Sequence, residues 1–141
     1  MKTPNQLALY LAGAINGMSD ADCKTWREMV KLNWAGQILD PMRRDYRHAQ
    51  ITKDVSAEIV NFDIADINEA DALLVYYTKP SVGTSMEIFY ASSVLHKPVF
   101  LVNASGRNLS PWLLHHTTGI SQTLTIQTLA DIQNHLMAKQ S

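Results

Sequence analysis

The sequence predicts one α/β domain over residues 1–141, with a five-stranded parallel sheet and helices on both of its faces. Short apolar runs alternate with amphipathic segments, which is typical of a doubly wound, flavodoxin-like or Rossmann-like sheet. Two of the runs, 72–77 and 99–102, are apolar on both faces, as the central strands of a parallel sheet must be. The chain has 141 residues, 46% of them hydrophobic, which is enough to bury the core of one domain.

The first half of the chain predicts two strands, two helices and a long polar loop. Apolar residues at helical spacing predict the first helix, for which Ser19 or Asp20 is a suitable N-cap. The second helix has apolar residues from Val55 to Ala70 on one face, Phe62 among them. The elements in order are a strand over 7–12 closed by Gly13, a helix over 20–33, a strand over 37–40, a loop over 42–52 and a helix over 55–70.

The second half of the chain predicts the rest of the sheet. The clearest strand of the sequence comes first and is followed by a turn with Pro80 and Gly83, both residues typical of turns. The elements are a strand over 72–77, a turn over 78–83, a helix over 84–95, strands over 99–102 and 119–125, and a closing helix over 126–137. In the common strand order 2-1-3-4-5, a ligand lies where the ends of strands one and three meet. We therefore expect function in segments 13–18 and 78–87.

Composition and charge exclude several classes of function. Twelve basic and thirteen acidic residues give a net charge of −1, so the chain has no basic excess for binding DNA or RNA. Cys23 is the single cysteine, and no CxxC motif exists, so we expect neither a disulfide nor a structural zinc site. No apolar run approaches the ~20 residues of a membrane span, and the start lacks the layout of a signal peptide. We expect a cytoplasmic protein without a metal or organic cofactor.

The segment from Tyr10 to Gly17 is the first unusual piece of sequence. A strand that runs into Gly13-x-x-x-Gly17 allows the backbone to approach a ligand closely. The glycine spacing is not that of a dinucleotide-binding fingerprint, and no Gly-Lys-Ser/Thr follows as in a Walker loop. An ordinary tight turn explains the two glycines about equally well.

The segment from Lys79 to Glu87 is the second unusual piece of sequence. With Thr84 or Ser85 as N-cap, Glu87 falls in the first turn of a helix whose N-terminus points at the expected pocket. One interpretation is a carboxylate nucleophile that the positive end of the helix keeps ionised. The alternative is a capping-box glutamate with a structural role.

Three aspartates precede the third strand. Asp71 stands at the junction of helix and strand, where we expect a structural role. Asp63 and Asp66 are three residues apart and share a helix face. The simplest interpretation of Asp66 is a residue on a solvated face, whereas Asp63 reaches the strand ends only if its helix passes close to the pocket.

Taken together, these segments resemble the nucleoside 2-deoxyribosyltransferase family and its sister group, the deoxynucleoside 5′-monophosphate N-hydrolases. The similarity extends from Tyr10 to about Leu114. The motifs that carry it are Tyr10-Leu11-Ala12-Gly13, Asp63 with Ile67 and Ala70-Asp71, Gly83-Thr84-x-x-Glu87, and Ala91 with Lys97-Pro98-Val99. No single motif is specific, but their order and spacing together are.

The resemblance implies that Glu87 is the nucleophile and that Asp63 assists the departing base. The enzyme would cleave the N-glycosidic bond of 2′-deoxynucleosides or their monophosphates through a deoxyribosyl-glutamate intermediate, and would transfer the sugar to another nucleobase. This is the chemistry of two carboxylates at a retaining glycosidic centre. Two alternatives stay open: an N-hydrolase that transfers the sugar to water, and a nucleotide-binding sensor without turnover.

The resemblance also implies the residues that bind substrate and the partners of the chain. In the hydrolase branch a serine at the position of Ser81 contacts the 5′-phosphate, but Asn16-Gly17 stands where that branch has an arginine. The loop with Arg43, Arg44 and Arg47 could compensate by clamping a phosphate, or could be a solvated turn. Tyr10 and Tyr46 are candidates for stacking on a base. The expected partners are a nucleoside or nucleotide, a free nucleobase and at least one further copy of the chain, to whose site Asn108 or Ser110 would contribute. The candidate substrate-binding residues are Tyr10, Gly13, Asn16, Arg44, Asp45, Ser81, Gly83, Thr84, Asn108 and Ser110.

Overall fold

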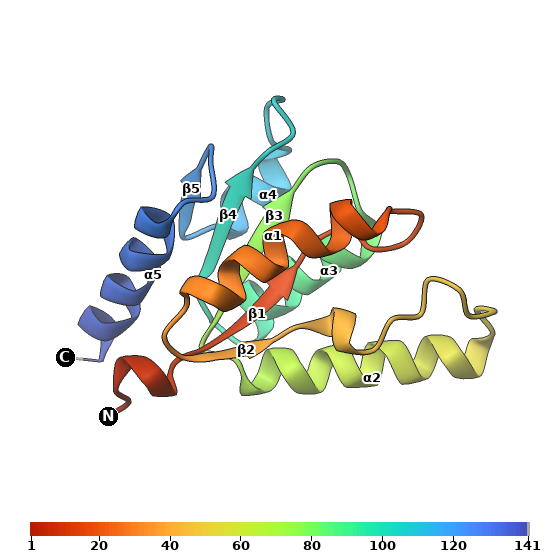
Figure 1. Ribbon diagram of the computed structural model, residues 1–141, viewed down its shortest axis with the longest axis horizontal. Helices are drawn as coiled ribbons and strands as arrows, with labels where there is room; N and C mark the ends of the chain where they lie inside the picture. Colours follow the sequence, from red (N-terminus) through yellow and green to blue (C-terminus); the bar gives the residue numbers. More distant parts are fainter. Residues whose placement is uncertain (141) are drawn as a thin grey trace.

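The computed structural model, described here for residues 1–140, is built on a five-stranded sheet of order β2-β1-β3-β4-β5 (Figure 1). Every neighbouring pair of strands is parallel. The strands are β1 (Ala8–Ala12), β2 (Gln37–Leu39), β3 (Ala72–Tyr77), β4 (Val99–Asn103) and β5 (Gly119–Ser121). The predicted fold class and strand order are confirmed, although β5 is shorter than the apolar pattern suggests.

Helices connect the strands in the expected sequence. The α-helices are α1 (Asp20–Asn33), α2 (Lys53–Glu69), α3 (Val82–Phe89), α4 (Pro111–His116) and α5 (Ile126–Lys139). Short 3₁₀ turns form η1 (Pro4–Gln6) and η2 (Pro41–Arg43), and a π-helical turn, η3 (Tyr90–Val94), continues α3. The sequence did not predict α4, because a helix of six residues is too short to show a periodic apolar pattern.

The start of α3 differs from the expectation. Ser81 is the N-cap, in an extended conformation, and its Oγ accepts a hydrogen bond of 3.4 Å from the N–H of Thr84. The helix therefore begins at Val82, three or four residues before the positions that Thr84 or Ser85 as cap would give. Ser, Thr and a second Ser are all good caps, so local preference alone does not choose between them. As a consequence, Glu87 lies in the second turn of α3.

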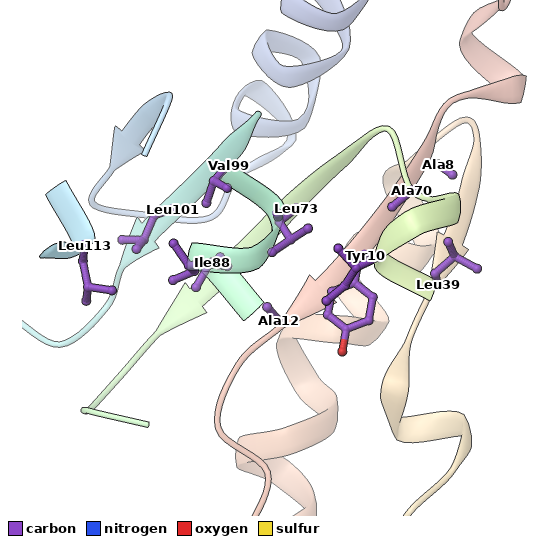
Figure 2. Close-up of a cluster of buried hydrophobic side chains, with 13 residues drawn as sticks. Ala8, Tyr10, Ala12, Leu39, Ala70, Leu73, Ile88, Val99, Leu101 and Leu113 are labelled. Carbon is purple, nitrogen blue, oxygen red and sulfur yellow. The ribbon is translucent and has the colours of Figure 1, made fainter. Parts of the chain in front are cut away.

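Both faces of the sheet are covered by helices, and β1 is buried on both sides. Ala8, Tyr10 and Ala12 point toward α2 and α3 in one cluster (Figure 2), whereas Leu9 and Leu11 point toward α1 and α5 in the other. Trp26 and Trp34 belong to the second cluster, and Cys23 is fully buried. On α2, however, Phe62 is 43% exposed and does not belong to the buried face.

The C-terminal end of α2 is fixed by a lysine and an aspartate. The Lys97 ammonium donates hydrogen bonds to the backbone carbonyls of Ile67 (2.9 Å), Asn68 and Ala70, which the helix leaves without partners. Asp71 accepts a hydrogen bond of 2.8 Å from the N–H of Ala8 and pairs with Lys2, so its structural role is confirmed. These contacts fix the position of α2 relative to β1. Among residues 1–140, none of the helices combines the length and apolar character needed to cross a membrane.

Candidate active site

The loop that follows β1 owes its two glycines to packing and to a turn. A Cβ on Gly13 would lie 2.9 Å from Cζ2 of Trp26 and 3.2 Å from the carbonyl oxygen of Tyr76, so a larger residue does not fit. Trp26 is fixed there because its ring stacks on Tyr76, with 5.1 Å between centroids. Gly17 has a φ of +72°, within a turn closed by a 3.1 Å hydrogen bond from the N–H of Met18 to the carbonyl of Ile15. Asn16 is exposed at the tip of this turn.

Tyr10 connects β1 to the proposed nucleophile. Its hydroxyl donates a hydrogen bond to Oε2 of Glu87. The side chain has no exposed surface and packs among the core residues on the α2 and α3 side of the sheet (Figure 2). The ring therefore has no face on which a base could stack, and that expectation is wrong. What Tyr10 offers the site is its hydroxyl group.

The environment of Glu87 differs from the one that the sequence suggested. Burial raises the pKa of Glu87 from 4.5 to about 8, while the hydrogen bond from Tyr10 opposes this shift. Because Glu87 is in the second turn of α3, it is neither a capping-box residue nor held ionised by the first turn of the helix. At neutral pH this carboxyl group retains its proton when no substrate is bound.

Asp63 comes to the same place from α2. Burial raises its pKa, and the Arg44 guanidinium, 3.5 Å away, opposes this. Asp63 raises the pKa of Glu87, and both carboxyl groups raise the pKa of Tyr10 well above its usual value, after burial as the largest cause. Asp63 from α2 and Glu87 from α3 therefore both lie near the hydroxyl of Tyr10 from β1, and both carboxyl groups have raised pKa values. Such a group can hold a proton near neutral pH and donate it.

Asp66 is not on a solvated face, and that interpretation is wrong. Its side chain is buried, and its two oxygens accept hydrogen bonds from Arg43 (2.9 Å) and Arg44 (2.7 Å). Burial raises the pKa of Asp66, but the two arginines outweigh it and the net shift is downward. The Arg44 guanidinium also lies 4.9 Å from the centroid of the exposed Phe62 ring.

Arg47, in the same loop, forms ion pairs with two other aspartates of the chain. It pairs with Asp45 (2.8 Å) and Asp20 (2.6 Å) and donates a hydrogen bond of 3.1 Å to the carbonyl of Met18. Arg47 holds the pKa of Asp45 far below its usual value. All three arginines of the expected phosphate clamp are therefore engaged with aspartates of this chain, and the loop is attached to the one that follows β1.

The remaining candidates lie at two helix N-termini. Ser81 and Gly83 are at the start of α3, where the Ser81 hydroxyl serves as the cap and a Cβ on Gly83 would meet open space. Thr84, in the same turn, is buried. Asn108 and Ser110 are exposed in the loop between β4 and α4, and Ser110 caps α4. Within residues 1–140, neither of these two donates or accepts a hydrogen bond with Glu87 or Asp63.

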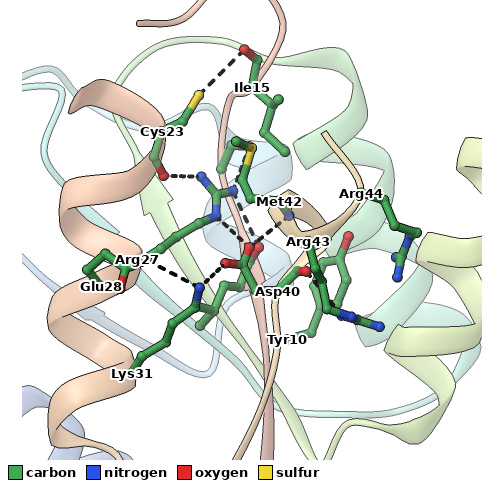
Figure 3. Close-up of polar contacts among 12 residues, drawn as sticks. Tyr10, Ile15, Cys23, Arg27, Glu28, Lys31, Asp40, Met42, Arg43 and Arg44 are labelled. Carbon is green, nitrogen blue, oxygen red and sulfur yellow. Dashed lines mark hydrogen bonds and ion pairs between the residues drawn. The ribbon is translucent and has the colours of Figure 1, made fainter. Parts of the chain in front are cut away.

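Arg27 is a residue at this site that the sequence analysis missed. It has no exposed surface, and it donates hydrogen bonds to the carbonyls of Cys23 (2.7 Å) and Gly13 (3.3 Å) beside Asp40 (Figure 3). The sequence pattern could have indicated its burial, because position 27 shares a helix face with the apolar residues Cys23 and Val30. Across the described residues, 1–140, no group of three or more His, Cys, Asp or Glu side chains is arranged to hold a metal ion.

Comparisons with known proteins identify the family and the fold. A family model described as nucleoside 2-deoxyribosyltransferase matches residues 9–137. Comparison with curated proteins gives no significant match. Among solved structures, the chain resembles a 2-deoxyribosyltransferase from the psychrotolerant bacterium Bacillus psychrosaccharolyticus, with a TM-score of 0.68 and 17% identity over 90% of each chain.

Two further structures share the fold at lower identity. A conserved protein from Enterococcus faecalis gives a TM-score of 0.63 and 14% identity over 95% of this chain and 99% of the other. A protein from Burkholderia pseudomallei, described as a putative pilus assembly-related protein, gives a TM-score of 0.61 and 10% identity over 99% and 95%. At these identities the structural likeness establishes the fold alone.

The raised pKa of Glu87 predicts a stability change in the variant Glu87→Gln. Between pH 4.5 and about 8 the folded protein holds a proton that the unfolded chain releases, so stability falls as pH rises through this window. Glutamine does not ionise, so the variant does not lose stability in this pH range. We expect Glu87→Gln to melt roughly 5 °C or more above the wild type at pH 9 and close to it at pH 4, in calorimetry.

The matched control is Glu58→Gln, which changes an exposed glutamate on α2. Its melting temperature should follow that of the wild type at both pH values. A Glu87→Gln variant that gains no stability at pH 9 would contradict the raised pKa.

Proposed function

Because the chain belongs to the nucleoside 2-deoxyribosyltransferase family, we propose that it cleaves the N-glycosidic bond of 2′-deoxynucleosides or their monophosphates and transfers the sugar to another nucleobase. The observation that carries this proposal is that Glu87 accepts a hydrogen bond from the Tyr10 hydroxyl and that Asp63 lies close enough to raise the pKa of both groups. Glycosidic chemistry uses two carboxyl groups with different roles, and ligands of a doubly wound sheet bind where the loops after its parallel strands begin.

In the first step, an oxygen of Glu87 attacks the anomeric carbon of the sugar. The bond from that carbon to the base nitrogen breaks, its electron pair goes to the base, and Asp63 donates a proton to the base. A deoxyribosyl ester of Glu87 results. In the second step a nitrogen of the incoming base attacks the same carbon, the ester bond breaks, and the proton of that nitrogen returns to Asp63. Glu87 therefore carries the sugar between the two bases, and Asp63 exchanges a proton with each base.

The ionisation of the two groups supports this assignment. Attack requires Glu87 as a carboxylate, and departure of the base requires a proton on Asp63, so the reactive pair carries one proton. Both pKa values are raised, which supports a pair that holds one proton around neutral pH. The positive charge that develops on the sugar favours the carboxylate at Glu87 and moves that proton to Asp63. The Tyr10 hydroxyl orients the Glu87 carboxylate.

The loops at the ends of β1 and β3 form the remainder of the site in this proposal. Gly13 and Asn16 are on the first loop, and Ser81, Gly83 and Thr84 form the start of α3 on the second. We assign them to the sugar and its 5′ end. The open space beside Gly83 supports a ligand approaching there. Arg44 and Asp45 act from the third loop, where Arg44 contacts Asp63 directly.

An exposed apolar face supports a homo-oligomer. Large hydrophobic side chains on α3 and the adjacent α4 are unusually accessible, among them Val82 (80%), Met86 (67%) and Trp112 (74%). Large apolar side chains exposed in one region of a soluble protein favour an interface there. Asn108 and Ser110 lie next to it, in the loop that leads into α4. We assign this face to a second copy, whose Asn108 or Ser110 completes the site.

A chromatographic assay tests the reaction. The protein would be incubated with each deoxynucleoside or its monophosphate, with and without a second free base. We expect a new deoxynucleoside only when the second base is present, because that base is the acceptor. Glu87→Ala should lose about a thousandfold or more of this activity while still binding the donor. Glu69→Ala, at an exposed position, is the matched control.

The other outcomes of this assay decide between the alternatives. Free base released from monophosphates without an acceptor would identify an N-hydrolase. Binding without turnover by the wild type would identify a sensor. Full activity of Glu87→Ala would exclude Glu87 as the nucleophile.

The pH dependence of the rate distinguishes the two carboxyl groups. We expect kcat/KM of the wild type to fall above about pH 8, as the proton shared by the pair is lost, and to fall in acid, where both groups are protonated. Asp63→Asn has no acidic proton to transfer, so the residual rate should be low and should lack the alkaline fall, with the acid limb alone remaining. Initial rates between pH 4 and pH 10 measure this. An unchanged bell-shaped profile in Asp63→Asn would remove Asp63 from the proton transfer.

Co-expression of two impaired variants tests the shared site. If the Asn108 side chain enters the partner's site, a heterodimer of Glu87→Ala and Asn108→Ala contains one intact site. We expect the mixture to regain about a quarter of the wild-type activity, as random pairing gives for a dimer. Light scattering should find no monomer at the assay concentration. A monomer, or a mixture no more active than its components, would contradict this arrangement.

A further inference from the structure

Arg27 is a charged side chain enclosed entirely by protein. Its guanidinium lies 4.4 Å from the centroid of the Trp26 ring, and its Nε is 3.2 Å from Oδ1 of Asp40. Apolar residues in place of a buried ion pair are often as stable or more stable, so stability alone does not account for an arginine at this position. Its other contacts indicate what it does.

Two of these contacts are with the end of β1. The guanidinium donates hydrogen bonds to the carbonyls of Gly13 (3.3 Å) and Leu11 (3.5 Å), on either side of Ala12, where the strand gives way to the loop. Asp40, at the end of β2, anchors the opposite side of the guanidinium and also accepts a hydrogen bond from the N–H of Met42 (Figure 3). Because the guanidinium is planar and rigid, these contacts fix the first loop relative to two strand ends.

The cluster around Arg27 carries excess positive charge. Asp40 is buried between two cations, Arg27 and Lys31, the second of which is 2.7 Å from its Oδ2. Lys31 also pairs at the surface with Glu28, which is well exposed and screened by solvent. The core of the cluster therefore has two positive charges and one negative charge, placed behind the site.

This charge acts on Glu87. The groups that influence the ionisation of Glu87 come from three elements: Tyr10 from β1, Asp63 from α2 and Arg27 from α1. Burial and Asp63 raise the pKa of Glu87, whereas the Tyr10 hydrogen bond and the Arg27 charge lower it. Arg27 is the cation in this set.

We propose that Arg27 is a positioning residue for the transfer reaction: it fixes the loop after β1 through the carbonyls of Leu11 and Gly13. This positioning part rests on the function proposed above. The charge part, which is the effect of Arg27 on Glu87, is a separate readout and is measurable without turnover.

The charge part is tested by ¹³C NMR titration of the glutamate carboxyl groups, with Glu87 identified by its absence in Glu87→Gln. We expect the pKa of Glu87 to rise by about one unit in Arg27→Met and to fall by a similar amount in Asp40→Asn, which leaves the arginine without its counter-charge. A purely structural role gives no reason for opposite signs. Lys24→Met, which removes an exposed charge from the same helix, should leave the titration unchanged.

Shifts of the same sign, or no shift in either variant, would overturn the charge part. If Arg27→Met does not fold, the kinetics of Arg27→Lys decide the proposal, because loss of the Asp40 charge by itself would also lower the pKa of Glu87.

The positioning part is tested by Arg27→Lys, which keeps the charge but loses the planar set of donors. We expect the Glu87 titration to stay as in the wild type while kcat/KM for a deoxynucleoside falls about tenfold, because the loop is no longer held. Wild-type kinetics in Arg27→Lys would overturn this part. A wild type inactive toward every donor would instead refute the proposed function, and the titration would still decide the charge part.

Discussion

The hydrogen bond between the Tyr10 hydroxyl and Glu87 is the interaction on which the site depends. β1 is buried on both faces, so a tyrosine at its centre must find a partner for its hydroxyl inside the protein. Glu87 supplies that partner from α3, and Tyr10 in turn supplies a donor to a carboxyl group that water reaches poorly. Each group thus reduces the cost of burying the other. The position of the proposed nucleophile is consequently tied to β1, an interior strand of the sheet that is buried on both faces, and not to a loop.

Around this contact the acidic residues divide into two sets. Asp66 is held by Arg43 and Arg44, Asp40 by Arg27 and Lys31, and Asp45 by Arg47. In Asp66 and Asp45 these partners lower the pKa, so both carboxylates stay ionised and serve to fix loops. Glu87 and Asp63 differ, because burial dominates and their pKa values are raised. Separation of acids into paired and poorly paired groups is how one site provides groups able to exchange protons near neutral pH.

The sequence predicts the sheet well and the site only in part, for physical reasons that particular residues illustrate. Continuous apolar runs such as 72–77 identify central strands, because burial on both faces leaves no polar position. The start of α3 was misplaced because Ser81, Thr84 and Ser85 are equally suitable caps. The roles of Asp63 and Asp66 depend on where Arg43 and Arg44 fold back, and these arginines are nineteen or more residues away from the aspartates in sequence. Arg27 was overlooked because its partners include main-chain carbonyls of residues 11 and 13, which no side-chain pattern reveals.

The loop after β1 shows how these constraints combine. Arg27 holds its first residues through the carbonyls of Leu11 and Gly13, and Arg47 holds its far end through the carbonyl of Met18. Between the two anchors only the turn with Asn16 and Gly17 is exposed. A reaction in which one base departs and another enters at the same carbon needs identical geometry for both steps, because attack depends on alignment to within a fraction of an ångström. Two buried or nearly buried guanidinium groups that bind the backbone meet this need better than loop side chains in water, since their own positions are fixed by aspartates. In the proposed reaction, the arginines contribute through the rigidity of the loop that they hold.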